Sequence, residues 1–296
     1  MVVILSIGLC IKKMLMPKIH IAKYEPNRLG GGWTWAREFA KGIGGRLGNY
    51  EESQVFVIPS PSMVEREEVN RAKADGKFIM LRLDNIIRNS RNRNTGMSRM
   101  QDFALVADVV IYQSEFAKDL LTGWVVPKQW AVIHNGCDLS IFNDSNRHES
   151  PIQRFLYSRF NRDETKNWEM ARYIYEREYR MDKDSLLTII GQFSDELREY
   201  NFDFYRNEKY QYLGVVQDPR ALADIYKNTD QLIYTYFNDA CSNTLIEALC
   251  SGCEILDPYN MAKTGGSYEI MQMFYEHGAD YFDSKRMVKQ YLEMLA

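Results

Sequence analysis

The segment that decides the fold is Asn238–Leu256, whose sequence is NDACSNTLIEALCSGCEIL. The stretch before it, Gln231–Phe237, is apolar, β-branched and aromatic, which predicts a buried strand. Ser242 or Asn243 suits the N-cap of a short helix, and Gly252 suits the position just after its end. We therefore expect a strand, a loop, a short helix and a second strand.

The same segment carries groups that suit a nucleotide-sugar. The N-terminus of a helix offers unpaired N–H groups and a partial positive charge, which favour a phosphate. Glu247, one turn into the helix, can accept two hydrogen bonds from a ribose diol, and Asp239, in the loop, can hold sugar hydroxyls. A capping loop with one acidic residue on each side explains the pattern equally well, so spacing alone leaves both interpretations open.

The order of these residues resembles a motif of a known family. Seven residues separate Asp239 from Glu247, and Ala248, Leu249 and Gly252 follow. This pattern resembles the E-x7-E segment of family-four retaining glycosyltransferases, with Asp in place of the first Glu. The resemblance implies an α/β chain with the GT-B architecture, in which two Rossmann-like domains with parallel sheets face each other across a cleft.

A second segment resembles the same family. The residues that fit the family's I-P-N-G-V-D-x-x-x-F segment are Ile133, Asn135, Gly136, Asp138 and Phe142. His134 and Cys137 stand where the family has Pro and Val. Asn-Gly is also an ordinary turn signal, so this match alone would not identify the family. It supports the resemblance because it precedes the E-x7-E-like segment in the same order as in the family. In the family, this segment joins the first domain to the second.

The order of strands and helices predicts two domains. Strands alternate with helices along the chain, which indicates parallel sheets, and the length suits two domains of about 130–150 residues. We expect an acceptor-side domain over residues 17–145 and a nucleotide-sugar-binding domain over residues 150–280. A C-terminal helix over 286–296 is expected to cross back to the first domain. Residues 1–16 form an extension of open role, with an apolar run too short to span a bilayer stably.

The resemblance also implies a set of catalytic residues. In the family, an arginine and a lysine after the first strand of the second domain lie near the donor diphosphate, and Arg159 and Lys166 match these types. The gap between them is slightly longer than in the family, so Arg162 competes for the arginine role. Fixed cations stabilise the charge on a leaving diphosphate without a metal. Asp84 ends a predicted strand, where ligands bind in open α/β sheets, and is the candidate for an acceptor contact or a base. The predicted catalytic residues are Asp239, Arg159, Lys166 and Asp84.

The donor is expected to contact a larger set of residues. Gly31 and Gly32 follow the first predicted strand, and the missing Cβ atoms would let the backbone approach a ligand, although a plain flexible turn is an alternative. Val216 is assigned to the nucleobase through the resemblance alone. The predicted donor-binding residues are Gly31, Gly32, Ser242, Asn243, Thr244, Glu247 and Val216.

Composition bounds the class of protein. A hydrophobic share of 45%, a charged share of 26% and a net charge of −3 are ordinary for a globular protein, and nothing global indicates nucleic-acid binding. The odd count of five cysteines, without a disulfide framework, favours reduced thiols and a cytoplasmic location. Cys250 and Cys253 form a lone C-x2-C pair, which a helix end followed by a strand explains better than zinc.

The predicted activity is transfer of a hexosyl group, with retention of configuration, from a nucleoside-diphosphate sugar to an acceptor hydroxyl. The donor is expected to be a UDP-sugar, and no metal or other cofactor is expected. The acceptor stays open between a glycan, a lipid-linked sugar and modified DNA.

Three alternatives to this activity stay open. The stretch 85–99 carries Arg88, Arg91, Arg93 and Arg99. It is either a solvated polar loop or a basic loop that would recruit an anionic acceptor such as hydroxymethylpyrimidine bases in DNA. A nucleotide-sugar epimerase would share the fold. The third alternative is a non-catalytic nucleotide-sugar-binding protein, and the Asp at position 239 is the one feature that favours it.

Overall fold

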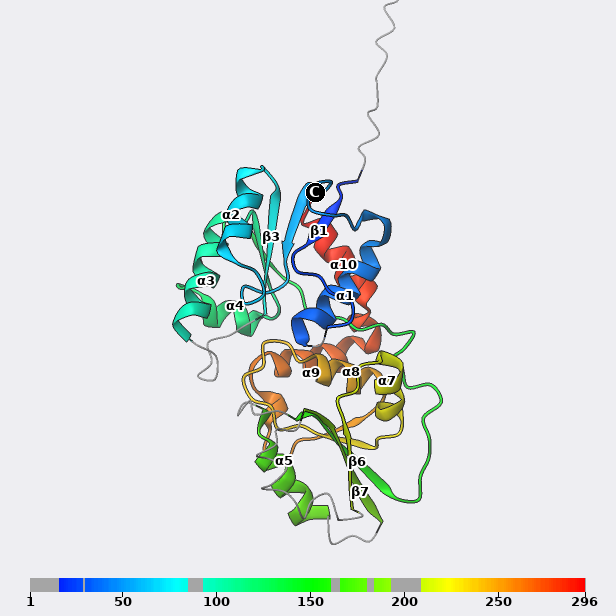
Figure 1. The fold of residues 1–296 in the computed structure, drawn as a ribbon. Coiled ribbons are helices and arrows are strands. Elements are labelled where there is room, and N and C mark those ends of the chain that lie inside the picture. Colours follow the sequence, from blue (N-terminus) through cyan, green and yellow to red (C-terminus); the bar gives the residue numbers. More distant parts are fainter. Residues whose placement is uncertain are drawn as a thin grey trace, which may run out of the picture.

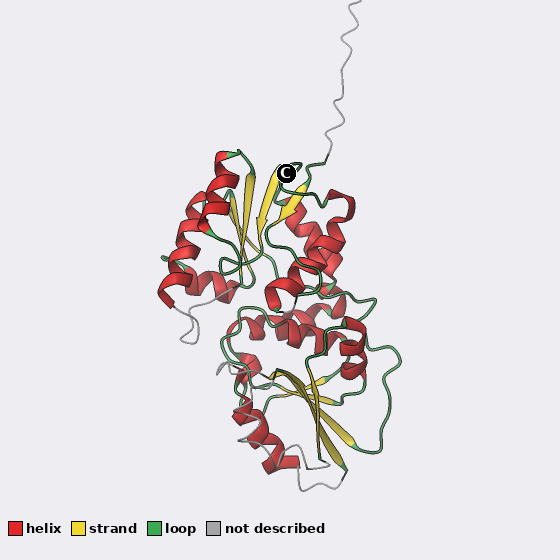
Figure 2. Cartoon of the chain, in the orientation of Figure 1, coloured by secondary structure: helices red, strands yellow, loops and turns green. Residues whose placement is uncertain are grey.

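The chain folds into two lobes, each built on a parallel five-stranded sheet with helices on its faces (Figure 1; Figure 2). The computed structural model describes residues 16–28, 30–84, 93–160, 166–179, 184–192 and 209–295. Within these ranges, the side chains of residues 93–97, 159, 160, 178 and 179 are left undescribed.

The first lobe contains a sheet whose strands follow one another in chain order. Its strands are β1 (Ile19–Ile21), β2 (Val55–Ile58), β3 (Phe78–Leu83), β4 (Val109–Tyr112) and β5 (Trp130–Val132). Apolar side chains cover both faces of this sheet, so helices pack on both sides. One face carries α1 (Gly31–Ile43) and α10 (Ser284–Glu293). The other carries α2 (Arg66–Ala74), α3 (Arg93–Val106) and α4 (Glu115–Leu121).

The C-terminal helix α10 belongs to the core of the first lobe, although the chain reaches it from the second. Figure 1 shows α10, in red, beside α1, in blue. The ring of Tyr291 lies 5.2 Å from that of Trp35 and 5.3 Å from that of Phe39, measured between centroids. This aromatic cluster fastens the end of the chain to α1.

The second lobe contains a sheet whose strand order reverses. Its strands are β6 (Gln153–Phe160), β7 (Ser185–Gly191), β8 (Tyr210–Gly214), β9 (Gln231–Ile233) and β10 (Glu254–Leu256). The order in the sheet is β10-β9-β6-β7-β8, so the chain leaves β6 in one direction and later returns to β9 on its other side. In open α/β sheets such a reversal opens a crevice at the carboxyl ends of the two strands, and ligands bind there.

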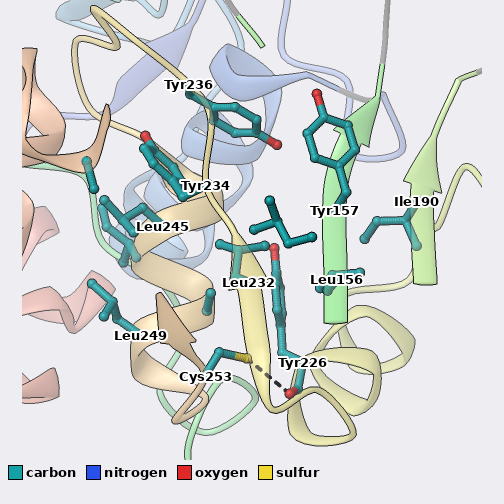
Figure 3. Packing of buried hydrophobic residues seen from close by; sticks show 14 of the residues in the cluster. Leu156, Tyr157, Ile190, Tyr226, Leu232, Tyr234, Tyr236, Leu245, Leu249 and Cys253 are labelled. Carbon is teal, nitrogen blue, oxygen red and sulfur yellow. Dashed lines mark hydrogen bonds between the residues drawn. The ribbon is translucent and has the colours of Figure 1, made fainter. Parts of the chain in front are cut away.

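The helices of the second lobe are α5 (Trp168–Ile174), α7 (Pro219–Lys227), α8 (Asn243–Cys250) and α9 (Gly265–His277). A single wider turn, Tyr175–Tyr179, extends α5, and short turns cover Met261–Lys263 and Ala279–Phe282. All eight residues of α8 are buried, which fixes the helix tightly in the lobe. Figure 3 shows Leu245 and Leu249 of this helix near Leu232 of β9.

The cysteines of the second lobe are part of this core. Cys253 Sγ donates to Tyr226 O at 3.2 Å, the contact dashed in Figure 3. Burial raises the pKa of the Cys241 and Cys253 thiols to about 12, so both are protonated and unreactive. Among the described residues, no cluster of three His, Cys, Asp or Glu side chains is arranged to hold a metal ion.

A contact between the lobes is made by Glu269 of α9. Its carboxylate accepts from the backbone N–H groups of Glu115, at 2.8 Å, and Phe116, at 2.6 Å, at the start of α4. His134 Nε2 lies 3.2 Å from the same carboxylate. A residue of the second lobe therefore caps a helix of the first, which constrains how the lobes face each other.

Two helices begin inside stretches that the sequence predicts as turn or loop. α1 starts at Gly31, so Gly31 and Gly32 lie in its first turn and not in a loop. α3 starts at Arg93, inside the predicted loop over 85–99. Its first half is polar and contains a glycine, which lowers helix propensity, whereas Met100 and Phe103 bury the second half against the sheet. None of the helices in the described ranges is both long enough and apolar enough to cross a bilayer.

Candidate functional site

A cavity of about 600 Å³ lies between the two lobes. The carboxyl ends of both sheets open into it, because each sheet is parallel and directs its strands toward the other lobe. From the first lobe it is lined by Gly30–Gly32 after β1, Asp84 after β3 and Asn135–Asp138 after β5. From the second it is lined by Ile190–Gln192, Val215–Gln217 and, after β9, Asp239 and Cys241–Asn243.

The N-terminus of α8 opens onto this cleft. Ser242 caps the helix, its Oγ accepting from Leu245 N at 3.3 Å, and Ser242 and Asn243 both line the cavity. No acidic residue occupies the first turn, so the positive end of the helix is not neutralised locally. One turn further in, Glu247 is 3% exposed and accepts from Tyr226 Oη at 3.4 Å. The helix therefore presents N–H donors and a buried carboxylate to one cavity.

Lys166 and Asp239 form an ion pair in the same wall of the cleft. Lys166 Nζ donates to Asp239 Oδ2 at 2.9 Å, and the two side chains are only 13% and 14% exposed. The ammonium also lies 4.3 Å from the centroid of the Tyr236 ring. The second Asp239 oxygen, Oδ1, accepts from Cys241 N at 3.2 Å. The lysine and the carboxylate thus enter the cleft at a defined separation.

A glycine of α9 holds the loop that carries Asp239. Gly266 N donates to Asp239 O at 2.8 Å. A Cβ atom at position 266 would lie 1.9 Å from Ala240 O, closer than any real contact. Only glycine permits this approach, so the N-terminus of α9 fixes the position of the Asp239 loop in the cleft.

The structure brings most of the predicted site residues together. Those that line the cleft are Gly31, Gly32, Asp84, Lys166, Val216, Asp239, Ser242, Asn243 and Glu247. Thr244 is 1% exposed and is not among the residues that line the cavity. The backbone of Arg159 is part of β6, but its side chain lies outside the described part of the structure.

The predicted arginine loop falls mostly outside the described residues. Arg88 and Arg91 are not described, and of Arg93 only the backbone is, as the first residue of α3. Arg99 lies in that helix and donates to Glu65 Oε2 at 2.6 Å. The prediction that Arg99 lies in a loop is therefore wrong: α3 begins at Arg93, and Met100, the next residue, packs in the core of the lobe.

Sequence reasoning missed a buried polar network in the first lobe. Arg82 of β3 lines the cleft, yet its side chain is 1% exposed. Its guanidinium donates to Pro59 O at 2.9 Å, to Gln113 Oε1 at 2.6 Å and to Asn135 Oδ1 at 3.2 Å. The signal was a lone charge inside the apolar strand FIMLRL, because charged residues are seldom fully buried without a specific partner.

A second group of charges lies beside the connection between the lobes. Burial raises the pKa of Glu38, and the nearby cations Lys41 and Arg37 oppose this only in part. Asp138 behaves differently: burial would raise its pKa, but hydrogen bonds from Lys41 and Ser140 outweigh it, so the pKa is lowered. The first lobe therefore places one poorly solvated and one ion-paired carboxylate near the cleft.

No family model matches the chain, and no curated protein matches it either. Solved structures do match. HepE of Anabaena, in complex with UDP and glucose, superposes with a TM-score of 0.74 at 12% identity, over 94% of this chain and 99% of that one. Sucrose-phosphate synthase of Thermosynechococcus elongatus gives 0.63 at 12% identity, over 95% of both chains. A glycosyltransferase of Rickettsia africae gives 0.57 at 14% identity, over 95% of this chain and 93% of that one.

The chain has the GT-B fold. The fold inferred from the E-x7-E-like segment, two Rossmann-like domains with parallel sheets facing across a cleft, is thereby confirmed. At these identities the likeness concerns the fold, and the chemistry has to be argued from the side chains that line the cleft.

Proposed function

We propose that this GT-B chain is a hexosyltransferase that moves a sugar from a UDP-sugar to an acceptor hydroxyl with retention of configuration. The observation that carries the proposal is the shared cleft of Lys166, Asp239, Glu247 and the α8 N-terminus. The cation and the N–H donors at the helix N-terminus suit the diphosphate of such a donor. The two carboxylates suit the hydroxyl groups of its hexose and its ribose. The UDP seen in the HepE structure supports this choice of nucleotide.

Each part of the donor has a proposed partner. The ribose diol donates to Glu247, whose buried carboxylate is already oriented by Tyr226. The hexose hydroxyls donate to Asp239, and Val216 contacts the nucleobase. Lys166, Arg159 and the amides of Ser242 and Asn243 bind the diphosphate, with Gly31 and Gly32 facing it from the first lobe.

In the proposed reaction, the bond between the anomeric carbon and the diphosphate oxygen breaks, and its electron pair stays on the diphosphate. The acceptor oxygen forms the new bond on the same face of the sugar and loses its proton. Lys166, Arg159 and the positive end of α8 stabilise the growing negative charge, so we propose that no metal is required. Asp84 is the proposed group near the acceptor.

Asp84 suits that role because one of its oxygens is unused. Among the described residues, Asp84 Oδ1 is buried and has no hydrogen-bond partner. A Cβ atom at Gly32 would lie 3.5 Å from Asp84 Oδ2, so the carboxylate faces the glycines at the start of α1. An acceptor hydroxyl there would satisfy the orphaned oxygen and could transfer its proton to it.

The first test is a panel of nucleotide-sugars ranked by thermal shift and then assayed for sugar release with and without candidate acceptors. We expect UDP-sugars to raise the melting temperature, and EDTA to leave turnover unchanged. The anomeric configuration of the product, read by NMR, decides retention. Conversion of the donor to an epimer, or release of free nucleotide that no acceptor accelerates, would favour an epimerase. Binding without turnover would favour a sensor.

A further inference from the structure

The network around Arg82 holds a buried cation whose hydrogen bonds all go to uncharged groups. Its three hydrogen bonds go to uncharged oxygens, those of Pro59, Gln113 and Asn135. The Asp84 carboxylate forms an ion pair with it, with Oδ2 3.9 Å from Nη1, which is too long for a hydrogen bond. Burying a charge is costly unless it is paired and hydrogen-bonded, so these partners hold the guanidinium in one position.

Arginine also fixes the polarity of the network. A guanidinium only donates, so Asn135 presents its oxygen to Arg82 and its Nδ2 group is left to donate elsewhere. That Nδ2 donates to Gln113 Oε1 and to Asn243 Oδ1, both at 2.8 Å, and lies 3.3 Å from Cys241 O. The Gln113 amide is oriented in the same way: its oxygen accepts from Arg82, and its Nε2 donates to Leu83 O at 3.1 Å.

The last member of this chain of hydrogen bonds reaches the donor site. Asn243 is the first residue of α8 and lines the cleft. Because its oxygen is taken by Asn135, its Nδ2 group is left as a donor, and within the described part of the chain no hydrogen bond uses it. A cation in the first lobe thus determines that an amide in the second lobe offers N–H groups and not a carbonyl.

We propose that Arg82 and Asn135 are positioning residues that orient the Asn243 amide to donate to the diphosphate of a nucleoside diphosphate. The inference rests on the proposed function, since it takes the donor's anionic group as the ligand. It makes the donor site a product of both lobes: Arg82 and Asn135 belong to the first, and Asn243 belongs to the second.

The test is a double-mutant cycle on the affinity for UDP, with uridine as the uncharged comparison and calorimetry as the measurement. Asn135→Ala and Asn243→Ala are each expected to weaken UDP binding about tenfold, because each removes one charge-assisted hydrogen bond or its orientation. The double variant is expected to bind UDP no worse than Asn243→Ala, because Asn135 acts through Asn243. Uridine affinity is expected to stay unchanged in all three.

Further variants keep the test decisive. Asn135→Ser replaces Asn135→Ala if melting curves show that the latter does not fold. Arg82→Lys keeps the charge but not the fixed fork, and is expected to weaken UDP selectively, whereas Arg71→Lys, at an exposed site, should change nothing. Additive losses, or equal losses for UDP and uridine, would overturn the positioning role. A wild-type protein that binds no UDP would overturn the proposed function and this inference with it.

Discussion

The two walls of the cleft are built in different ways. In the second lobe, the strand order reverses between β6 and β9, and Asp239, Asn243 and Glu247 come from one continuous segment beside that reversal. In the first lobe, the strands run in chain order without a reversal, and the lining comes from the ends of separate strands.

This difference in construction suits the second-lobe wall to the nucleotide and the first-lobe wall to the acceptor. A single strand, loop and helix can keep a constant geometry for a constant ligand, which suits a nucleotide. A wall assembled from separate loops can change one contact without disturbing the others, which suits a variable acceptor. The two walls are not independent, however, because Glu269 and the Asn135–Asn243 contact cross between them.

The largest expected effect tests the second-lobe wall. Lys166→Met should lower kcat about a hundredfold to a thousandfold, because the variant loses a fixed cation beside the leaving diphosphate. Steady-state kinetics with a UDP-sugar measure this. Lys289→Met, at a side chain that is 79% exposed, is the matched control. If the two variants turn over equally fast, Lys166 has no role in the reaction.

Two glycines, one that holds the Asp239 loop and one at the start of α1, allow the two walls to be compared by their stability. Gly266→Ala should lower the free energy of unfolding by about 3 kcal/mol, because the new methyl group collides with Ala240 O. Gly31→Ala meets nothing within 4 Å and should stabilise helix α1 by about 0.5 kcal/mol. Denaturant titration measures both. A Gly266→Ala protein as stable as the wild type would show that the Asp239 loop relaxes freely.

A smaller effect is expected at the first-lobe wall. Asp84→Asn should lower kcat about thirtyfold while leaving the affinity for UDP unchanged, because the residue is proposed to serve the acceptor only. Asp119→Asn, at a side chain that is 73% exposed, is the control. If Asp84→Asn weakens UDP affinity but turns over bound donor at the normal rate, the first-lobe wall does not serve the acceptor alone.

The smallest effect concerns the contact between the lobes. Burial would raise the pKa of Glu269, but hydrogen bonds from His134 and the amides of Phe116 and Glu115 outweigh it and lower the pKa below its ordinary 4.5. The stabilisation is therefore present above 4.5 and is lost as the pH falls through the lowered value.

Glu269→Gln should accordingly cost about 1 kcal/mol of unfolding free energy at neutral pH, where the charged cap is intact. The difference from the wild type should shrink as the pH falls below 4.5, as followed by thermal melting. Glu51→Gln, at a side chain that is 72% exposed, provides the baseline. A difference that stays constant with pH would mean that the carboxylate charge does not matter.

Much of the second-lobe wall could be predicted because it is local in the sequence. The helix that begins after Ser242 follows from cap chemistry and apolar content, and Glu247 lies one turn inside it wherever the segment folds. Lys166 was matched by residue type through the resemblance, but its pairing with Asp239 needed the tertiary structure. Helix starts were less well predicted, because α1 begins without a side-chain cap and α3 begins in a polar stretch that lacks apolar periodicity.

The sequence by itself determined the two-domain α/β pattern and the strand, loop and helix of the donor side, because these depend on periodicity and on contacts between near neighbours. Only the tertiary structure decided that Arg82, Asn135 and Asn243 form one hydrogen-bonded path, because they lie on β3, on the loop after β5 and on α8, far apart in the chain. The polarity of that path follows from a buried guanidinium that can only donate, and burial is a property of the assembled fold.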